Sequence, residues 1–456
     1  MELLIIVIFV VGYACIALEH PLKINKTATA LLLGVLVWTI LALSHTMEPK
    51  IISSELVKNL GETAEIVFFL LGAMTIVTLI EDYQGFRVIT DRITTTNKKK
   101  LLWILSILTF FLSALLDNMT TAIVMVALLR KLIADRKERW LYAGMVILAA
   151  NAGGAWSPIG DVTTIMLWIK GEVTTLNIIV KTLVASFVCI AIPVWIIGRT
   201  LKGDMERPQE ERSSLEVPAH LRRLVLIMGV AALIFVPVFK TITHLPPYLG
   251  MLFGLGILWI TTEIISRKYE KDGHKLPTAV ITLEHIDIPT ILFFLGILMA
   301  VSCLKVVGIL GHLADGLDSA FGTGVPGFFF IDLIIGVLSS IVDNVPLVAA
   351  VQGMYDHEAV DAVFGQNHPF WEFLAYCAGT GGSLLIIGSA AGVAVMGMEK
   401  IDFIWYLKKI SWLALLGYLA GAIVFIAMDI TLFEAIPWLR DLALAQPLSN
   451  QALPLV

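Results

Sequence analysis

The chain has 456 residues, of which 58% are hydrophobic and 15% are charged, and its formal net charge is −5. Soluble globular proteins carry about a quarter charged residues and under half apolar ones, so this composition excludes an ordinary soluble enzyme. All four cysteines lie inside apolar stretches, which argues against a disulfide framework or a zinc site. No nucleotide-binding loop of the G-x-x-x-x-G-K-[ST] form is present, and no cofactor is expected.

Apolar blocks of about 16–25 residues recur along the chain, and as helices they are long enough to cross ~30 Å of hydrocarbon. The first half contains the segments 3–18, 27–43, 64–81, 101–130, 139–170 and 175–199. The second half contains 222–240, 247–265, 287–306, 326–355, 371–399 and 403–427. The predicted fold class is an all-α polytopic membrane protein.

Three motifs of the first half recur in the second half in the same order, at a spacing of about 226 residues. They are Glu65–Gly72 with Pro289–Gly296, Ser113–Asn118 with Ser339–Asn344, and Asn151–Gly160 with Gly379–Gly388. Each match is weak alone, but their common order and spacing indicate an internal repeat.

The fourth segment of each half carries an Asp-Asn pair in its middle and is too long for one ordinary span. It forms either two true spans or a re-entrant hairpin that enters and leaves on one side. Lys and Arg accumulate in cytoplasmic loops, so the cations on both sides of 101–130 predict a hairpin with cytoplasmic ends. The stretch 306–370 contains no Lys or Arg, so the hairpin 326–355 is predicted to have external ends. The acidic loop residues of that stretch are Asp315, Asp318, Asp356, Glu358 and Asp361.

With re-entrant hairpins each half crosses the membrane five times, and an odd number forces the second half to run inverted, with both termini external. The predicted first repeat spans 1–199, with scaffold helices in 3–81, the hairpin 101–130 and a broken helix 139–170. The remaining parts are a cytoplasmic linker at 200–221, the second repeat at 222–427, with hairpin 326–355 and broken helix 371–399, and a C-terminal tail at 428–456.

Polar residues interrupt the apolar pattern at the two hairpin tips and the two broken helices. Carboxylate, amide and hydroxyl oxygens suit a dehydrated alkali cation, and carboxylates in a membrane are costly and usually functional. Asp161 aligns with Ser389, so the third carboxylate belongs to the first half alone, and we expect the main cation site there. The candidate ion-binding and proton-coupling residues are Asp117, Asn118, Asn151, Asp161, Thr163, Thr164, Asp343 and Asn344, with Na⁺ at Asp117 and Asp161 and weaker candidates at Ser339 and Ser383.

Each candidate also has a purely structural interpretation. Asp161 can cap a half-helix, and Asp117 and Asp343 can cap the second limbs of their hairpins. Thr163 and Thr164 can bond back to helix carbonyls. Asp332, inside the second hairpin, is either a second proton site or the partner of a neighbouring helix, and the sequence does not distinguish between these two roles.

The Asp-Asn tips and the Gly-Gly…Gly-Asp-Val-Thr-Thr break resemble the NhaD type of sodium/proton antiporter, within the ion transporter superfamily. The resemblance covers roughly residues 60–427 and carries the family's polar residues onto the eight main candidates above. It implies a bacterial inner-membrane protein, a homodimer with an elevator-like transport domain, that exchanges Na⁺ or Li⁺ for H⁺. Carboxylate-transporting relatives have Ser-Asn-Thr at the tips, so Asp-Asn favours a cation.

The expected function is therefore antiport of cytoplasmic Na⁺ or Li⁺ for external H⁺, in which both ions compete for buried carboxylates; no enzyme activity and no nucleic-acid partner are expected. A transporter of organic or inorganic anions on the same scaffold is the nearest alternative, although three carboxylates would repel its substrate. A membrane subunit of a sodium-pumping decarboxylase would need soluble partners. An intramembrane aspartyl protease would need a Gly-x-Gly-Asp pattern, where this chain has Pro158-Ile-Gly160-Asp161.

Overall fold

The computed structural model describes residues 2–205, 217–270, 276–355 and 363–433. Half of the predicted linker 200–221, the greater part of the predicted tail and the acidic residues Asp356, Glu358 and Asp361 lie outside these ranges. The described residues form helices joined by short connections, as the apolar blocks predict.

The first half contains ten helices among the described residues. They are α1 (Glu2–Ala17), α2 (Glu19–Leu22), α3 (Lys26–Leu43), α4 (Pro49–Asp82), α5 (Arg87–Thr90), α6 (Lys98–Ser113), α7 (Asn118–Leu132), α8 (Arg136–Gly154), α9 (Val162–Lys170) and α10 (Thr175–Thr200).

The second half follows a similar order and adds two short π-helical stretches. Its elements are α11 (Ala219–Thr243), α12 (Pro247–Glu270), α13 (Ala279–Glu284), α14 (Ile288–Val306), α15 (Ile309–Phe321), α16 (Gly327–Leu338), α17 (Asn344–Met354), α18 (Pro369–Gly381), α19 (Ala390–Glu399), α20 (Phe403–Tyr406), η1 (Leu407–Ser411), α21 (Trp412–Ala427) and η2 (Met428–Phe433).

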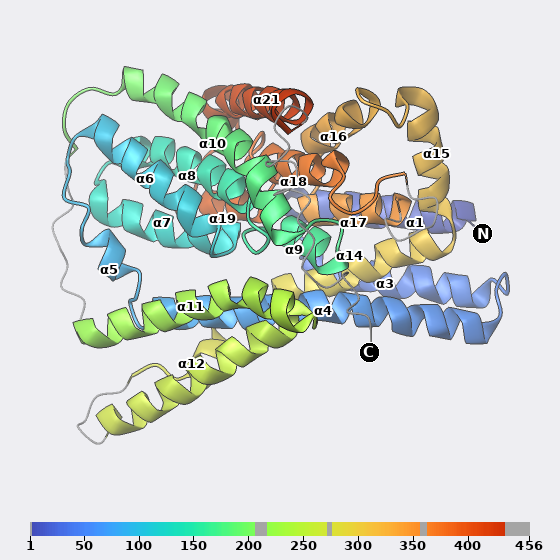
Figure 1. Cartoon of the computed structure of the whole chain (residues 1–456), viewed down its shortest axis with the longest axis horizontal. Helices are drawn as coiled ribbons and strands as arrows, with labels where there is room; N and C mark the ends of the chain where they lie inside the picture. Colours follow the sequence, from blue (N-terminus) through green and yellow to red (C-terminus); the bar gives the residue numbers. More distant parts are fainter. Residues whose placement is uncertain (1, 206–216, 271–275, 356–362, 434–456) are drawn as a thin grey trace, which may run out of the picture.

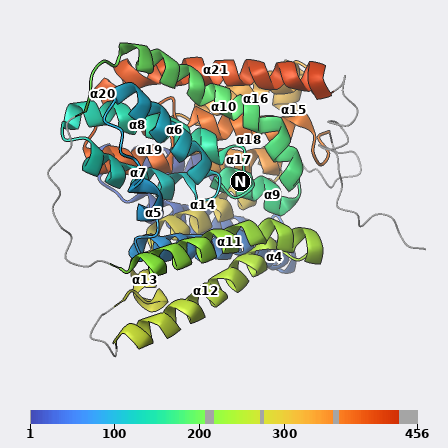
Figure 2. The ribbon, with the colours of Figure 1, turned by 60° about the vertical axis from the view of Figure 1, so that its left-hand side comes forward.

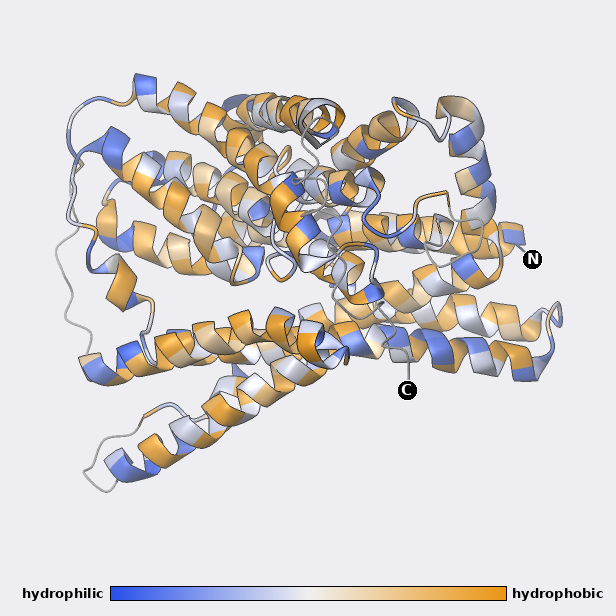
Figure 3. Ribbon diagram, viewed as in Figure 1, coloured by the Kyte–Doolittle hydropathy of each residue, from blue (hydrophilic) through white to orange (hydrophobic). Residues whose placement is uncertain are grey.

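Seven helices of the described residues are long and apolar enough to cross a membrane, which confirms the polytopic fold class. They are α3, α4, α10, α11, α12, α14 and the continuous stretch Phe403–Thr431. In Figure 3 hydrophobic residues cover most of α11 and α12, and hydrophilic residues gather at helix ends. Such exposed apolar faces are what a lipid-facing helix requires.

Helix α4 is longer than its predicted segment 64–81, because it begins at Pro49. Proline at the first helical position has its φ angle preset for a helix and loses no hydrogen bond there. The added turns carry charged residues such as Lys58 and Glu62, which a search for apolar blocks passes over. Hydropathy therefore located the membrane portion of α4 and missed its polar extension.

The helices form two layers, which Figures 1 and 2 show from two directions. One layer contains α4, α11 and α12, with α3 and α14 packed together beside α4. The other layer contains α6, α8, α10 and α21, with the hairpin and broken-helix elements packed among them. The half-helices that carry the candidate residues belong to this second layer.

The two halves repeat the same contacts between hairpin and broken helix. The hydroxyl of Ser113 donates to the carbonyl of Ala150 at 2.6 Å, and that of Ser339 donates to the carbonyl of Ala378 at 2.8 Å. A Cβ added to Gly381 would lie 2.0 Å from the Gly336 carbonyl oxygen, so this crossing requires glycine. The two halves thus share this hydroxyl-to-carbonyl contact between hairpin and broken helix.

Candidate ion-binding site

Asp161 is the N-cap of α9, at the break between α8 and α9, and its side chain is 1% exposed. Its carboxylate accepts a hydrogen bond from the backbone N–H of Thr163 at 3.3 Å. The break depends on Gly154, because a Cβ there would lie 2.5 Å from the Gly160 carbonyl oxygen. The capping interpretation of Asp161 is therefore correct, but this one long bond leaves most of the carboxylate available to other side chains.

Two asparagines, one from each hairpin tip, donate to the Asp161 carboxylate. The amide of Asn118, the first residue of α7, lies 3.1 Å from one carboxylate oxygen. The amide of Asn344, the first residue of α17, lies 3.2 and 3.4 Å from the two oxygens. The tips of both hairpins thus converge on a carboxylate that only the first half supplies.

Asn151 of α8 extends this network into the second broken helix. Its carbonyl oxygen accepts from Asn118 at 3.1 Å, and its amide nitrogen donates to the hydroxyls of Ser383 and Ser389, each at 2.9 Å. Ser389 was not among the predicted site residues, although it aligns with Asp161 and is the N-cap of α19. The repeat alignment therefore contained the signal that identifies it.

The carboxylates of Asp117 and Asp343 form contacts outside this network. Asp117 caps α7, accepting from the N–H of Thr120 at 2.8 Å and from its hydroxyl at 2.5 Å. Asp343 caps α17 through the N–H of Val345 at 3.3 Å, and it forms an ion pair of 3.5 Å with Lys26 of α3. These two predicted residues therefore border the network without hydrogen bonds to Asp161.

The remaining candidates differ in their contacts. The hydroxyl of Thr164 donates to the carbonyl of Asp161 at 2.8 Å, the local bond that its structural interpretation describes. The hydroxyl of Thr163 is buried and acts on the Asp161 carboxylate. Ser339 bonds the Ala378 carbonyl rather than the network. Of these three residues, Thr163 is accordingly the one whose hydroxyl lies at the carboxylate.

The network combines one carboxylate with amides and hydroxyls, all of which offer hard oxygen donors. Among the described residues no Lys, Arg or His forms an ion pair with Asp161. Burying an ionised carboxylate costs several kcal/mol per ion unless a cation or a proton compensates it. The geometry therefore favours a site that binds either a small cation or a proton.

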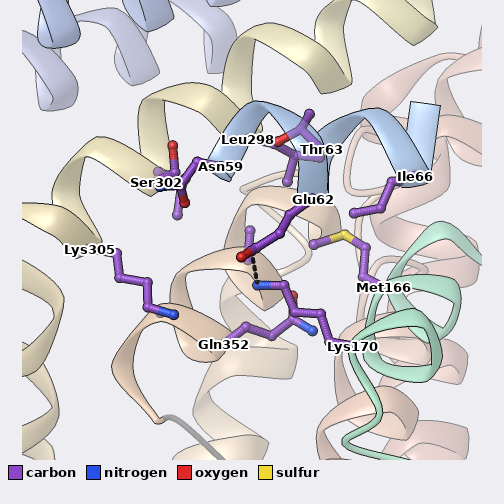
Figure 4. A pocket seen from close by; sticks show the side chains of 13 residues that line it. Asn59, Glu62, Thr63, Ile66, Met166, Lys170, Leu298, Ser302, Lys305 and Gln352 are labelled. Atoms are coloured by element: carbon purple, nitrogen blue, oxygen red, sulfur yellow. Dashed lines mark ion pairs between the residues drawn. The ribbon is translucent and has the colours of Figure 1, made fainter. Parts of the chain in front are cut away.

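A charged cavity lies between the two layers, as Figure 4 shows. Its walls come from α4 and α14 on one side and from α9 and α17 on the other, and Glu62 of α4 pairs with Lys170 of α9 at 3.9 Å. Met166 and Ala349, which line the cavity, each follow a site residue, Asp161 or Asn344, by five positions. At 1.5 Å per helical residue they lie roughly 7.5 Å along the same half-helices.

Comparison with known proteins places this arrangement in a family. A family model described as citrate transporter matches residues 13–371, well over half of the chain. The chain belongs to that transporter family. The resemblance to NhaD-type members of the ion transporter superfamily is confirmed by relatives that carry the names of sodium/proton antiporters.

Two plant sodium/proton antiporters and a bacterial one are similar to this chain. The chain is 47% identical to sodium/proton antiporter 1 of Arabidopsis thaliana, over 94% of this chain and 72% of that protein. It is 44% identical to sodium/proton antiporter 2 of the same plant, over 92% of this chain and 98% of that protein. It is 29% identical to the Na⁺/H⁺ antiporter NhaD of Vibrio cholerae, over 93% and 91%.

A solved structure shares the fold of the chain. The YdaH transporter of Alcanivorax borkumensis is 13% identical and aligns with a TM-score of 0.58, over 89% of this chain and 98% of that one. At such low identity the likeness supports the architecture alone.

Proposed function

We propose that this transporter exchanges cytoplasmic Na⁺ or Li⁺ for external H⁺, and that the two ions compete for Asp161. The observation that carries the proposal is the convergence of both hairpin tips on this buried carboxylate. The sodium/proton antiporter names of the relatives support the same exchange.

In the cation-bound state the amides act as ligands rather than donors. Rotation of Asn118 or Asn344 by half a turn about its last bond presents its carbonyl oxygen in place of the NH₂ group. The cation then meets the Asp161 carboxylate, amide oxygens and the hydroxyl of Thr163. Asp117 supplies the second carboxylate once it exchanges its bonds to Thr120 for the ion.

In the proton-bound state Asp161 is neutral and needs no cation. The proton occupies one carboxylate oxygen, which removes the charge that attracts Na⁺. Because one group holds either ion, binding of one releases the other. This competition couples the two fluxes without a separate gate for each.

The coupling requires that the loaded site reach both sides of the membrane. We propose that the layer with the hairpins and broken helices moves against the scaffold of α1, α3, α4, α11, α12 and α14, in an inverted-repeat plan with repeats at 1–199 and 222–427. The cavity of Figure 4 is then the external route to Asp161. The same plan has both termini external, re-entrant hairpins, and a homodimer in a bacterial inner membrane.

Transport of an anion is the competing function, because the matching family model is described as citrate transporter. An anion site needs cationic side chains or bare helix N-termini. The N-termini of α7, α9 and α17 are capped by Asp117, Asp161 and Asp343, whose charge repels an anion. The cation is therefore the better fit.

The test uses acidified everted vesicles from a strain that lacks its own antiporters, with an internal pH-sensitive dye. Addition of NaCl or LiCl is expected to raise the internal pH, whereas KCl and sodium-free citrate leave it unchanged. The response is expected to vanish in Asp161→Asn and to persist in Asp402→Asn, a matched change at the exposed N-cap of α20. A response to citrate without any response to Na⁺ would reject the proposal.

A further inference from the structure

A second pair of buried carboxylates lies in the second half, away from the Asp161 network. Asp332 of α16 and Glu372 of α18 are both 0% exposed. All four of their carboxylate oxygens are buried. Both oxygens of Asp332 lack a hydrogen-bond partner within the described ranges, whereas the Asn177 side chain of α10 hydrogen-bonds Glu372. A buried carboxylate without donors is rare in proteins, so this pair requires an explanation.

The packing of α16 against α18 places the two carboxylates at about the same height along the helix pair. The rings of Phe329 and Phe373 lie 5.0 Å apart, and two turns further along α16 a Cβ added to Gly336 would lie 2.6 Å from the carbonyl oxygen of Cys377. Asp332 lies between Phe329 and Gly336 on the same face of α16, at helical spacings of three and four. Its charge interacts with that of Glu372.

Charged and titratable groups of the surrounding elements also act on the pair. Lys181 of α10 forms an ion pair of 2.9 Å with Asp429 of η2, and both act on Glu372. Other groups that interact with members of this cluster are Asn177 of α10, Tyr355 after α17, Tyr418 of α21 and the thiol of Cys377. The charge of Lys181 partly compensates that of Glu372, and Asp429 weakens this compensation because it pairs with the same lysine.

A path toward the surface begins at His368. This residue is the N-cap of α18, one helical turn before Glu372, and it is half-buried. Its Nδ1 accepts from the N–H of Phe370 at 3.2 Å, which leaves Nε2 for another partner. Burial, with the charge of Lys181, lowers the pKa of His368, so the ring is mainly neutral near pH 7 and can accept and pass on a proton.

Two neighbouring buried carboxylates cannot both be ionised at low cost, and a shared proton relieves both the repulsion and the desolvation. We propose that Asp332 and Glu372 form a second proton-binding site, which takes up a proton and releases it during each transport cycle. The proton moves between water at the His368 end and a carboxylate oxygen, with no other bond made or broken.

The consequence concerns the number of protons per sodium ion, and it rests on the proposed antiport. The helices that hold the pair, α16 and α18, pack in the same layer as the Asp161 network. When that layer moves, the pair carries its proton along with the occupant of Asp161. Each Na⁺ is then exchanged for one proton more than the Asp161 network alone exchanges, which makes transport more sensitive to membrane voltage.

The test measures protons per Na⁺ in proteoliposomes, from the Na⁺ gradient and voltage at which net flux reverses. Glu372→Gln and Asp332→Asn are each expected to exchange one proton fewer per Na⁺ than the unmodified protein while still transporting Na⁺. Asp287→Asn, at the N-cap of α14 in the scaffold, is the matched control and is expected to keep the original ratio.

The outcomes separate the two proposals. If the unmodified protein exchanges Na⁺ for H⁺ and both variants keep its ratio, the second site is wrong and the antiport stands. If the unmodified protein shows no Na⁺/H⁺ exchange, the proposed function itself fails and this inference falls with it.

A second measurement serves if the variants do not fold. Dicyclohexylcarbodiimide reacts with protonated buried carboxyl groups, and mass spectrometry locates the label in the full-length, unmodified protein. Labelling of Asp332 or Glu372 is expected at low pH and is expected to fall as pH rises, because the proton is released. Labelling that is absent or independent of pH would overturn the proposal, since it would show a pair that does not exchange its proton.

Discussion

The two halves of the molecule use the same framework for different chemistry. In the first half Asp161 caps the second part of the broken helix, and in the second half Ser389 occupies the equivalent position. The second half instead buries Asp332 and Glu372, whose equivalents in the repeat alignment are Ser106 and Gly144. Similar backbone breaks thus position helix ends and hairpin tips in both halves, and a few carboxylates without a counterpart in the other half distinguish the two.

The largest effect is expected from exchanging the two N-cap residues that differ between the halves, Asp161 and Ser389. Asp161→Ser is expected to abolish Na⁺-dependent proton movement in everted vesicles. The double variant Asp161→Ser with Ser389→Asp is expected to remain inactive, because the side chain at 389 contacts Asn151 rather than Asn118 and Asn344. Activity in the double variant would show that a carboxylate works equally well at position 389, and it would contradict the difference between the two halves.

A large effect on stability is expected at the ends of the half-helices. The buried Glu399, at the end of α19, accepts from Arg130 and Arg139, each at 2.7 Å. The corresponding half-helix α9 instead contacts the other layer at its end. There Lys240 of α11 donates to the carbonyl of Trp168 in α9.

Glu399→Gln removes the charge that both arginines share and leaves Arg139 unpaired in a largely buried position. The free energy of unfolding is expected to fall by about 3 kcal/mol, in the range for breaking a buried ion pair. Thermal unfolding in detergent, followed by tryptophan fluorescence, measures this. Lys170→Gln serves as the comparison, because its pair with Glu62 is 3.9 Å long and more exposed, and a smaller change is expected.

The two tips are expected to contribute equally to cation binding, since each places one amide beside Asp161. Asn118→Ala and Asn344→Ala each remove an amide oxygen that the bound cation would contact, a polar contact to a charged group worth about 1.5–3 kcal/mol. The Na⁺ concentration for half-maximal exchange is therefore expected to rise by about 10-fold or more in each. A rise confined to Asn118→Ala would restrict the site to the first half.

The smallest effect is expected at Ser389, which the Asn151 amide contacts together with Ser383. Ser389→Ala removes one of two equivalent acceptors, a loss of about 1 kcal/mol for a neutral hydrogen bond. The half-maximal Na⁺ concentration is expected to rise by about 5-fold. A complete loss of exchange would instead place Ser389 in direct contact with the ion.

Several features of the fold follow from local sequence alone. Asp117, Asp161, Asp343 and Ser389 all precede half-helices that begin at the next residue, as N-cap chemistry predicts. The amphipathic α15 was not predicted, because its polar residues break the apolar pattern that marks a span. Hydropathy detects long, uniformly apolar helices and misses a short helix that has one polar face.

The sequence by itself determined that the chain is a helical membrane protein, that it contains a repeat, and that polar residues gather at tips and breaks. Only the tertiary structure decided which of those residues meet. Asn118, Asn151 and Asn344 share contacts around Asp161, whereas Asp117 and Asp343 bond to Thr120 and Lys26. The physical reason is that capping depends on neighbours along the chain, while the direction of a carboxylate at a helix crossing depends on donors that distant segments supply.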